Sequence, residues 1–226
     1  MSSKPVLRVL STKISFHLKH ILFPIDLREL TEVLSGLGYA IPPQTLQALP
    51  GPGMIEISYM VGSGPIAKKG NLLVDINSDR GFIGVGGQSI PDVILSFEEV
   101  EKAICNNFGI DPNTDIRFYE ILARLDCEVE NNILESMSKI SDGALFTRLG
   151  KIIGKMPILY GIRLVPKGAV PNQEEWFDIT IQPHLYKPNQ VYQISVIYRS
   201  ADRNNVLATF KNLEEIILKI IKELQT

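Results

Sequence analysis

The stretch LLVDINSDRGFIGVGGQSIPDVILSFEEVEKAICNNF, residues 72–108, decides the expected fold class. Residues 72–77 alternate between the two faces of an extended chain, residues 78–81 are turn formers, and residues 82–85 form a second extended run; together they predict a β-hairpin. Residues 96–108 open with a capping-box pattern and continue as one apolar stripe at helical spacing, which predicts a helix. A hairpin followed directly by a helix favours an antiparallel sheet with helices packed on it.

The residues before this stretch predict the same kinds of element. Residues 14–20 alternate apolar with polar side chains and predict a strand, and residues 26–38 predict a short capped helix. Residues 54–61 predict a further strand. Residues 62–70 are rich in glycine and are expected to be a flexible link. Its two adjacent lysines, of which Lys68 is the first, could touch an anion or simply be solvated.

The second part of the chain repeats this order with longer elements. Alternation predicts a strand over residues 119–127 and three later strands. A helical region is interrupted at residues 141–143, where the pattern indicates a stop and a new N-cap. The final helix begins after Asn212 and carries a broad apolar face. The other expected elements are the helical region 133–153, the strands 158–165, 176–182 and 191–199, and the turns 166–172 and 187–189.

Each half of the chain therefore has the order strand, helix, three strands, helix, over residues 13–108 and 115–226. We expect an α+β fold: a curved, mostly antiparallel sheet with helices on one face, built from two pseudo-repeated β-α-β-β-β-α halves in a single compact unit. The segments 72–108 and 192–224 resemble the duplicated saddle of the TATA-box-binding protein family. That resemblance implies a concave sheet face available for binding. A helix-grip fold, with one sheet around a long C-terminal helix, is the competing topology.

Composition and charge argue against several classes of protein. The 226 residues are 45% hydrophobic and 21% charged, which is ordinary globular composition, and isoleucine is the commonest residue, which favours strands. The net charge of -2 provides no global basic field, so sequence-independent nucleic-acid binding is not favoured. No stretch approaches the roughly 20 apolar residues of a membrane span, and the first residues hold no signal-peptide core. We expect a cytoplasmic protein with no membrane partner.

The local patterns that could carry chemistry are incomplete. Residues 84–87 lack the full GxGxxG spacing and no helix opens directly after them, so a glycine-rich strand end or bulge is expected. His17 and His20 would lie on opposite faces of a strand and cannot share a metal. Cys105 and Cys127 lack a CxxC pattern and are expected to be buried thiols. No catalytic residue, metal site or cofactor is therefore expected.

Alternation also predicts which side chains lie on the sheet face opposite the helices. This face is polar and carries both signs of charge, and its carboxylates would repel phosphates, so duplex DNA is not an expected partner. The residues assigned to it are His17, Lys19, Glu56, Ser58, Asp75, Asn77, Glu120, Arg124, Arg163, Trp176, Asp178, Thr180, Gln182, Gln193, Ser195 and Arg199.

Four of these residues form the candidate site: Arg163, Trp176, Asp178 and Arg199. Two guanidinium groups, an aromatic surface and a carboxylate suit a small anionic or planar ligand. The alternatives are a solvated face with cross-strand charge pairs and a contact between protein partners or copies of the chain through an exposed Trp176. We expect a non-catalytic binding or interaction module that uses the open face or an edge strand. An enzyme acting on a small polar or anionic substrate at these residues is the second hypothesis, and a nucleic-acid-binding protein is the third.

Overall fold

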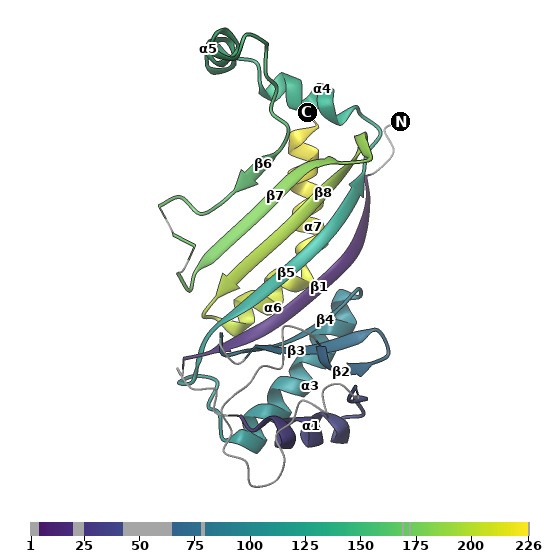
Figure 1. The fold of residues 1–226 in the computed structure, drawn as a ribbon, viewed down its shortest axis with the longest axis vertical. Helices are drawn as coiled ribbons and strands as arrows, with labels where there is room; N and C mark the ends of the chain where they lie inside the picture. Colours follow the sequence, from purple (N-terminus) through teal and green to yellow (C-terminus); the bar gives the residue numbers. More distant parts are fainter. Residues whose placement is uncertain are drawn as a thin grey trace.

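The computed structural model describes residues 5–19, 25–42, 65–77, 80–168, 170–171 and 173–225. Within these residues the protein is an α+β fold with six helices and one open, eight-stranded antiparallel sheet, whose strand order is β2-β3-β4-β1-β5-β8-β7-β6 (Figure 1). The strands are β1 (Val6–Leu18), β2 (Pro65–Lys69), β3 (Leu72–Asn77), β4 (Phe82–Gly87), β5 (Ile116–Glu128), β6 (Ile162–Leu164), β7 (Trp176–His184) and β8 (Lys187–Ser200).

The centre of the sheet is the antiparallel pair β1 and β5. Ile14 lies opposite Ile121 and Phe16 opposite Tyr119, so the apolar positions of both strands face the same side. The sheet twists strongly, and as a result β2 to β4 run nearly across the direction of β5, β7 and β8 (Figure 1). The register places most of the buried apolar residues of the long strands beneath the helices.

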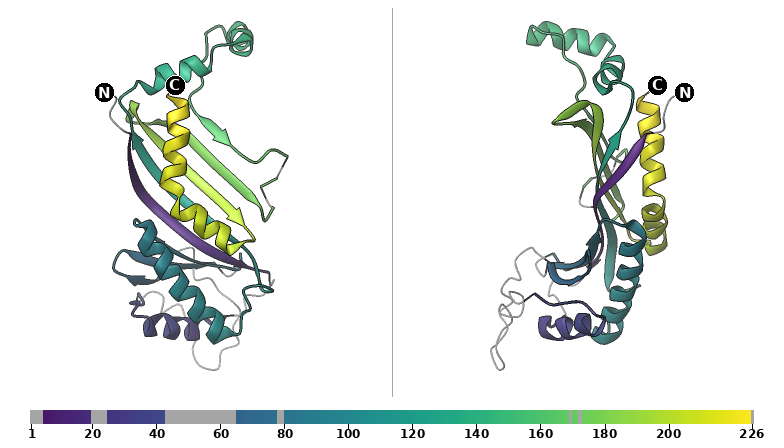
Figure 2. Two further views of the ribbon diagram at one scale, coloured as in Figure 1. Left: turned by 180° about the vertical axis from the view of Figure 1, so that it is seen from behind. Right: turned by 90° about the vertical axis from the view of Figure 1, so that its right-hand side faces the viewer.

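The helices α3, α6 and α7 cover one face of the sheet, and the opposite face lacks this cover (Figure 2). The buried core lies between these helices and the sheet, with Phe16 and Phe97 in aromatic contact at a centroid distance of 6.2 Å. None of the described helices is long and apolar enough to cross a membrane. The helices are α1 (Leu27–Gly36), α3 (Ile90–Phe108), α4 (Ile133–Ile140), α5 (Ala144–Ile153), α6 (Arg203–Lys211) and α7 (Leu213–Leu224).

Several helix boundaries follow from local capping. The Asp26 carboxylate accepts hydrogen bonds from the first-turn amides of α1, as the sequence predicts. The break at residues 141–143 is confirmed, because α4 ends at Ile140 and α5 begins after Gly143. The predicted start of the second helix at Ser96 is wrong. The helix begins at Ile90, because the Ser89 hydroxyl caps it and Pro91 suits its first turn.

Other differences from the predicted elements concern strand limits. The link predicted over residues 62–70 contains strand β2, which pairs with β3. The strand predicted over 158–165 is reduced to β6, and the turn predicted at 187–189 belongs to β8, since the hairpin turns at Leu185 and Tyr186. The strand predicted over 54–61 lies outside the described residues, as do His20, Glu56 and Ser58.

Candidate functional site

The uncovered side of the sheet, which we call the open face, collects the side chains that alternate with the buried ones. On β1, Ser15 alternates with Ile14 and Phe16, and it lies opposite Gly84 on one side and Glu120 on the other. The register carries this face across the sheet and includes every residue that alternation assigned to it within the described strands. Its members are Val6, Arg8, Ser11, Lys13, Ser15, His17, Lys68, Leu73, Asp75, Asn77, Phe82, Gly84, Gly86, Phe118, Glu120, Leu122, Arg124, Asp126, Glu128, Arg163, Trp176, Asp178, Thr180, Gln182, Val191, Gln193, Ser195, Ile197 and Arg199.

The four residues predicted as a site do lie on the open face, and the structure brings them together in pairs. Arg163 and Asp178 form a two-pronged ion pair, in which Nε donates to both carboxylate oxygens at 3.0 and 3.1 Å. Trp176 lies opposite Arg199 on neighbouring strands. The expectation of an exposed Trp176 is wrong, because its side chain is only 6% exposed. Both guanidinium groups have carboxylate partners, as the alternative of cross-strand charge pairs proposed.

Arg199 belongs to a second, more buried ion pair at the centre of the sheet. Its Nε donates to Glu120 Oε2 at 3.0 Å, and its Nη1 donates to the carbonyl oxygens of Pro171 and Gln173 in the loop before β7. The guanidinium also lies over the ring of Phe118 at 4.4 Å. Arg199 therefore ties this loop to the sheet and is not free to bind an external anion.

Glu120 also faces His17, whose Nε2 lies 3.7 Å from Oε1. Burial alone would raise the pKa of Glu120, but interactions with His17 and Arg199 outweigh it and hold this pKa below the ordinary value. Ser15 Oγ lies 3.4 Å from the same Nε2 of His17. A Ser-His-Glu triad needs the serine and the carboxylate on different ring nitrogens, so this cluster does not have the geometry of a nucleophilic site.

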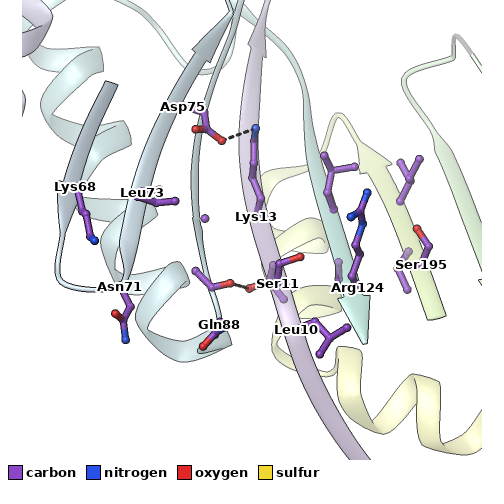
Figure 3. Close-up of a pocket in the computed structure, with 17 residues that line it drawn as sticks. Leu10, Ser11, Lys13, Lys68, Asn71, Leu73, Asp75, Gln88, Arg124 and Ser195 are labelled. Atoms are coloured by element: carbon purple, nitrogen blue, oxygen red, sulfur yellow. Dashed lines mark hydrogen bonds and ion pairs between the residues drawn. The ribbon is translucent and has the colours of Figure 1, made fainter. Parts of the chain in front are cut away.

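A groove of about 630 Å³ crosses the open face beside this cluster (Figure 3). Its side walls come from β2 and β3 on one side and from β5 and β8 on the other. Lys13 crosses its middle, where Nζ lies 2.9 Å from Asp75 Oδ2 (Figure 3). The polar side chains that line the groove are Ser11, Thr12, Lys13, Lys68, Asn71, Asp75, Gln88, Arg124 and Ser195.

The floor of the groove lacks side chains because β4 presents glycines there. A Cβ on Gly84 would lie 2.9 Å from both Lys13 Cε and Ser15 Cβ, which is too close for real carbon atoms. A Cβ on Gly86 would lie 3.2 Å from the carbonyl oxygen of Thr12. Glycine therefore lets the Lys13 side chain lie across β4 and reach Asp75 on β3, and it leaves the space above β4 open.

Two cations at the groove have no charge partner in the part of the chain that the structure describes. Lys68 on β2 and Arg124 on β5 are exposed and lie on opposite sides of the groove (Figure 3). The carboxylates Asp75, Glu120, Asp126 and Asp178 of the open face are each paired with a cation of that face. These four carboxylates therefore oppose an incoming anion less than free carboxylates would, because each is paired within the protein.

Sequence reasoning missed the groove for a specific reason. The strand predicted to begin at Ile14 begins at Val6, and a register shift between Val9 and Ser11 breaks the alternation there. Ser11 and Lys13 lie before the predicted start of the strand, so they were not assigned to the open face, although they continue the alternation of Ser15 and His17. Arg124 was assigned to the correct face, but only the register shows that it lacks a partner.

Among the described residues, no group of three or more His, Cys, Asp or Glu side chains could hold a metal ion. No protein-family model matches this chain, and the search of curated proteins finds no match either.

Proposed function

We propose that this protein is a non-catalytic binding module, and that the groove on its open face receives an extended ligand carrying at least two anionic groups. The observation that carries the proposal is the pair of unpartnered cations, Lys68 and Arg124, on opposite sides of a glycine-floored groove. A cation at each side favours ligands that have an anion near each end.

The charge balance of the open face supports this choice of ligand. Because each of the four carboxylates named above has its own cation, the positive charges of Lys68 and Arg124 are not cancelled. Neutral hydrogen-bonding groups such as Asn71, Gln88 and Ser195 lie between or beside these cations. Such groups orient a ligand, while the charges draw it to the face.

The separation of the two cations indicates the size of the ligand. Lys68 and Arg124 lie on strands four positions apart in the sheet, which places their backbones about 19 Å apart at the usual strand spacing. Long, flexible side chains shorten the span between the charges. A single phosphate cannot reach both of them. An acidic peptide or another chain-like polyanion can, whereas two free cations are few for tight nucleic-acid binding, which uses about 6–10 phosphate contacts.

Fluorescence anisotropy with a labelled oligoglutamate peptide tests this proposal. The wild-type protein should bind the peptide, inorganic tripolyphosphate should compete, and the affinity should fall as salt is added. The double variant Lys68→Gln/Arg124→Gln should bind at least about ten-fold more weakly, because each lost contact is charge-assisted. Lys102→Gln, an exposed lysine on helix α3, is the matched control and should leave the affinity unchanged.

Two results would overturn the proposal. One is wild-type affinity for the peptide in the double variant. The other is tighter, salt-dependent binding of a single-stranded oligonucleotide than of the peptide, which would favour nucleic acid as the ligand.

We also infer that the chain contains a duplicated β-α-β-β-β-α unit, residues 13–108 and 115–226, with a pair of helices at each helical place of the second half and one saddle-like sheet shared by both. The strand order supports this inference. From the centre outward, the sheet has β1, β4, β3 and β2 on one side and β5, β8, β7 and β6 on the other. In each case the first strand in sequence is central and the fourth lies next to it.

A further inference from the structure

A cluster of exposed apolar side chains lies away from the groove, on helix α5 and the residues that follow it. Helix α5 stands away from the sheet at one end of the molecule (Figures 1 and 2), and Gly150 is its only buried residue. Ile152 is 81% exposed and Ile153 is 61% exposed, and Met156, directly after the helix, is 69% exposed. Monomeric proteins seldom expose so many large apolar side chains together, so this surface indicates a binding partner.

The apolar side chains of α5 occupy one side of the helix. Leu145, Leu149 and Ile152 follow the spacing i, i+4 and i+7, and Ile153 continues the same stripe. Arg148 and Lys151 lie outside this stripe, on the polar arc of the helix.

The charged side chains around helix α5, from residue 143 to residue 173, are all positive. Lys155 follows the helix directly, and residues 143–173 contain no Asp or Glu at all. Of the cations in this segment, Arg163 is paired with Asp178 on the open face, whereas Arg148, Lys151 and Lys155 have no ion-pair partner in the part of the chain that the structure describes. We call residues 144–156 the α5 tip.

We propose that the α5 tip docks onto an anionic lipid surface. The helix lies flat in the headgroup region, its apolar stripe enters the boundary of the acyl chains, and its lysine and arginine side chains extend to the lipid phosphates. The expectation of no membrane partner concerned a stretch long enough to cross a bilayer. A helix that lies on the surface needs no such length, because only one of its faces enters the lipid.

The charge pattern selects a lipid surface over a second copy of the chain. Two α5 tips in contact would bring together cations of the same sign with no carboxylate between residues 143 and 173 to compensate them. An anionic bilayer satisfies both features at once, since it offers apolar depth beside a layer of negative charge. The tip also projects from the body of the protein, so it reaches a flat surface without hindrance from the sheet (Figure 2).

Co-sedimentation of the full chain with lipid vesicles tests this proposal. Wild-type protein should partition onto vesicles of phosphatidylcholine mixed with phosphatidylglycerol, and only weakly onto vesicles of phosphatidylcholine alone. The variant Ile152→Asp/Ile153→Asp should lose at least about ten-fold in partition coefficient, because both side chains leave the lipid. Arg148→Gln/Lys151→Gln should lose roughly twenty-fold, since a cation near such a surface contributes about five-fold.

Three controls make the test specific. Leu95→Asp replaces a side chain that is 67% exposed on α3 and should not change partitioning. Lys68→Gln/Arg124→Gln should not change it either, which separates the α5 tip from the groove. Circular dichroism should show that all variants keep the wild-type fold, as expected for changes at exposed positions.

The proposal is overturned if the wild-type protein does not bind either kind of vesicle or binds both equally. It is also overturned if the variant Ile152→Asp/Ile153→Asp binds the vesicles as tightly as the wild type does. It is also overturned if analytical ultracentrifugation shows a dimer of the wild type that this same variant dissociates. That result would make the α5 tip an interface between copies of the chain.

Discussion

The first four strands of the chain and the last four are arranged in the same order about the centre of the sheet, yet their open faces differ. In the last four, Arg199 and the Arg163–Asp178 pair carry long side chains across neighbouring strands. In the first four, Gly84 and Gly86 leave the space above β4 empty except for Lys13. The outer strands of the second set thus carry paired side chains across their open face, whereas the space above β4 stays open and belongs to the groove, whose opposite wall comes from β5 and β8.

The comparison also separates two uses of charge. Four carboxylates of the open face, Asp75, Glu120, Asp126 and Asp178, are bound to cations of the protein itself, so they offer little to a ligand. Lys68 and Arg124 form no such pair in the described chain, and their charges remain available. A functional site is therefore better sought among unpaired charges than among the most densely charged positions.

The largest expected effect on stability is that of Glu120→Gln, on β5, where the two sets of strands meet. The substitution leaves the nearly buried Arg199 guanidinium without its carboxylate, which should lower the free energy of unfolding by about 3 kcal/mol at pH 7. Urea denaturation of the wild type and the variant measures this difference in the free energy of unfolding. Glu174→Gln, in the half-exposed pair with Arg117, is the control and should cost less than about 1 kcal/mol.

The effect of Glu120→Gln should depend on pH in a defined direction. Because the pKa of Glu120 is lowered in the folded protein, its stabilisation is complete above the ordinary value of 4.5 and is lost as the pH falls through the folded value. The stability difference between wild type and variant should therefore shrink below about pH 4.5. A difference that stays constant down to pH 3, or grows, would contradict the ion-pair assignment.

A smaller loss of stability is expected for Gly84→Ala, which adds one carbon to the open face of β4 beneath the Lys13 side chain. The new Cβ meets Lys13 and Ser15, so the Lys13–Asp75 pair must move, at a cost of roughly 1–3 kcal/mol. Gly36→Ala in α1 is the matched control, since a Cβ there meets no atom within 4 Å, and it should be neutral or slightly stabilising. Equal melting temperatures for the two variants would show that β4 tolerates a side chain beneath Lys13 and would remove the basis of the comparison.

The last prediction involves no change in stability and concerns the two buried cysteines, Cys105 on α3 and Cys127 on β5, on the helix-covered side of the sheet. Burial raises the pKa of both thiols to about 11, and nearby Glu101 adds to the effect on Cys105. Compared with an ordinary thiol, each should hold about a hundred-fold less thiolate near neutral pH and react correspondingly slowly with a disulfide reagent. Fast modification of either thiol in the native protein would show that the core is open beneath that set of strands.

Much of the open face could be predicted from alternation alone. Side chains on a strand must point to opposite faces in turn, so Arg163, Asp178 and Arg199 were assigned to one face correctly. Their pairing could not be predicted, because it depends on the register between strands that are far apart in the sequence. The burial of Trp176 could not be predicted either, because alternation gives the face on which a side chain lies but not how much of it neighbouring residues cover.

Two elements were missed for local reasons. Helix α6 contains Asn204 and Asn205, which are weak helix formers, and it forms because the Asp202 carboxylate caps both of their amides and three of its residues are buried in the core. The first residues of β1 were missed because Leu10 adds a residue to the strand and interrupts its period of two.

The most direct test of the central claim is an amide chemical-shift map of the protein titrated with the oligoglutamate peptide. The account predicts that the largest shifts cluster at residues 11–13, at Lys68, Asn71 and Leu73, and at Arg124, all of which line the groove. Shifts at Arg163, Asp178 and Trp176, with none at the groove, would contradict it. They would show that the surface of β6 and β7, and not the groove, receives the ligand.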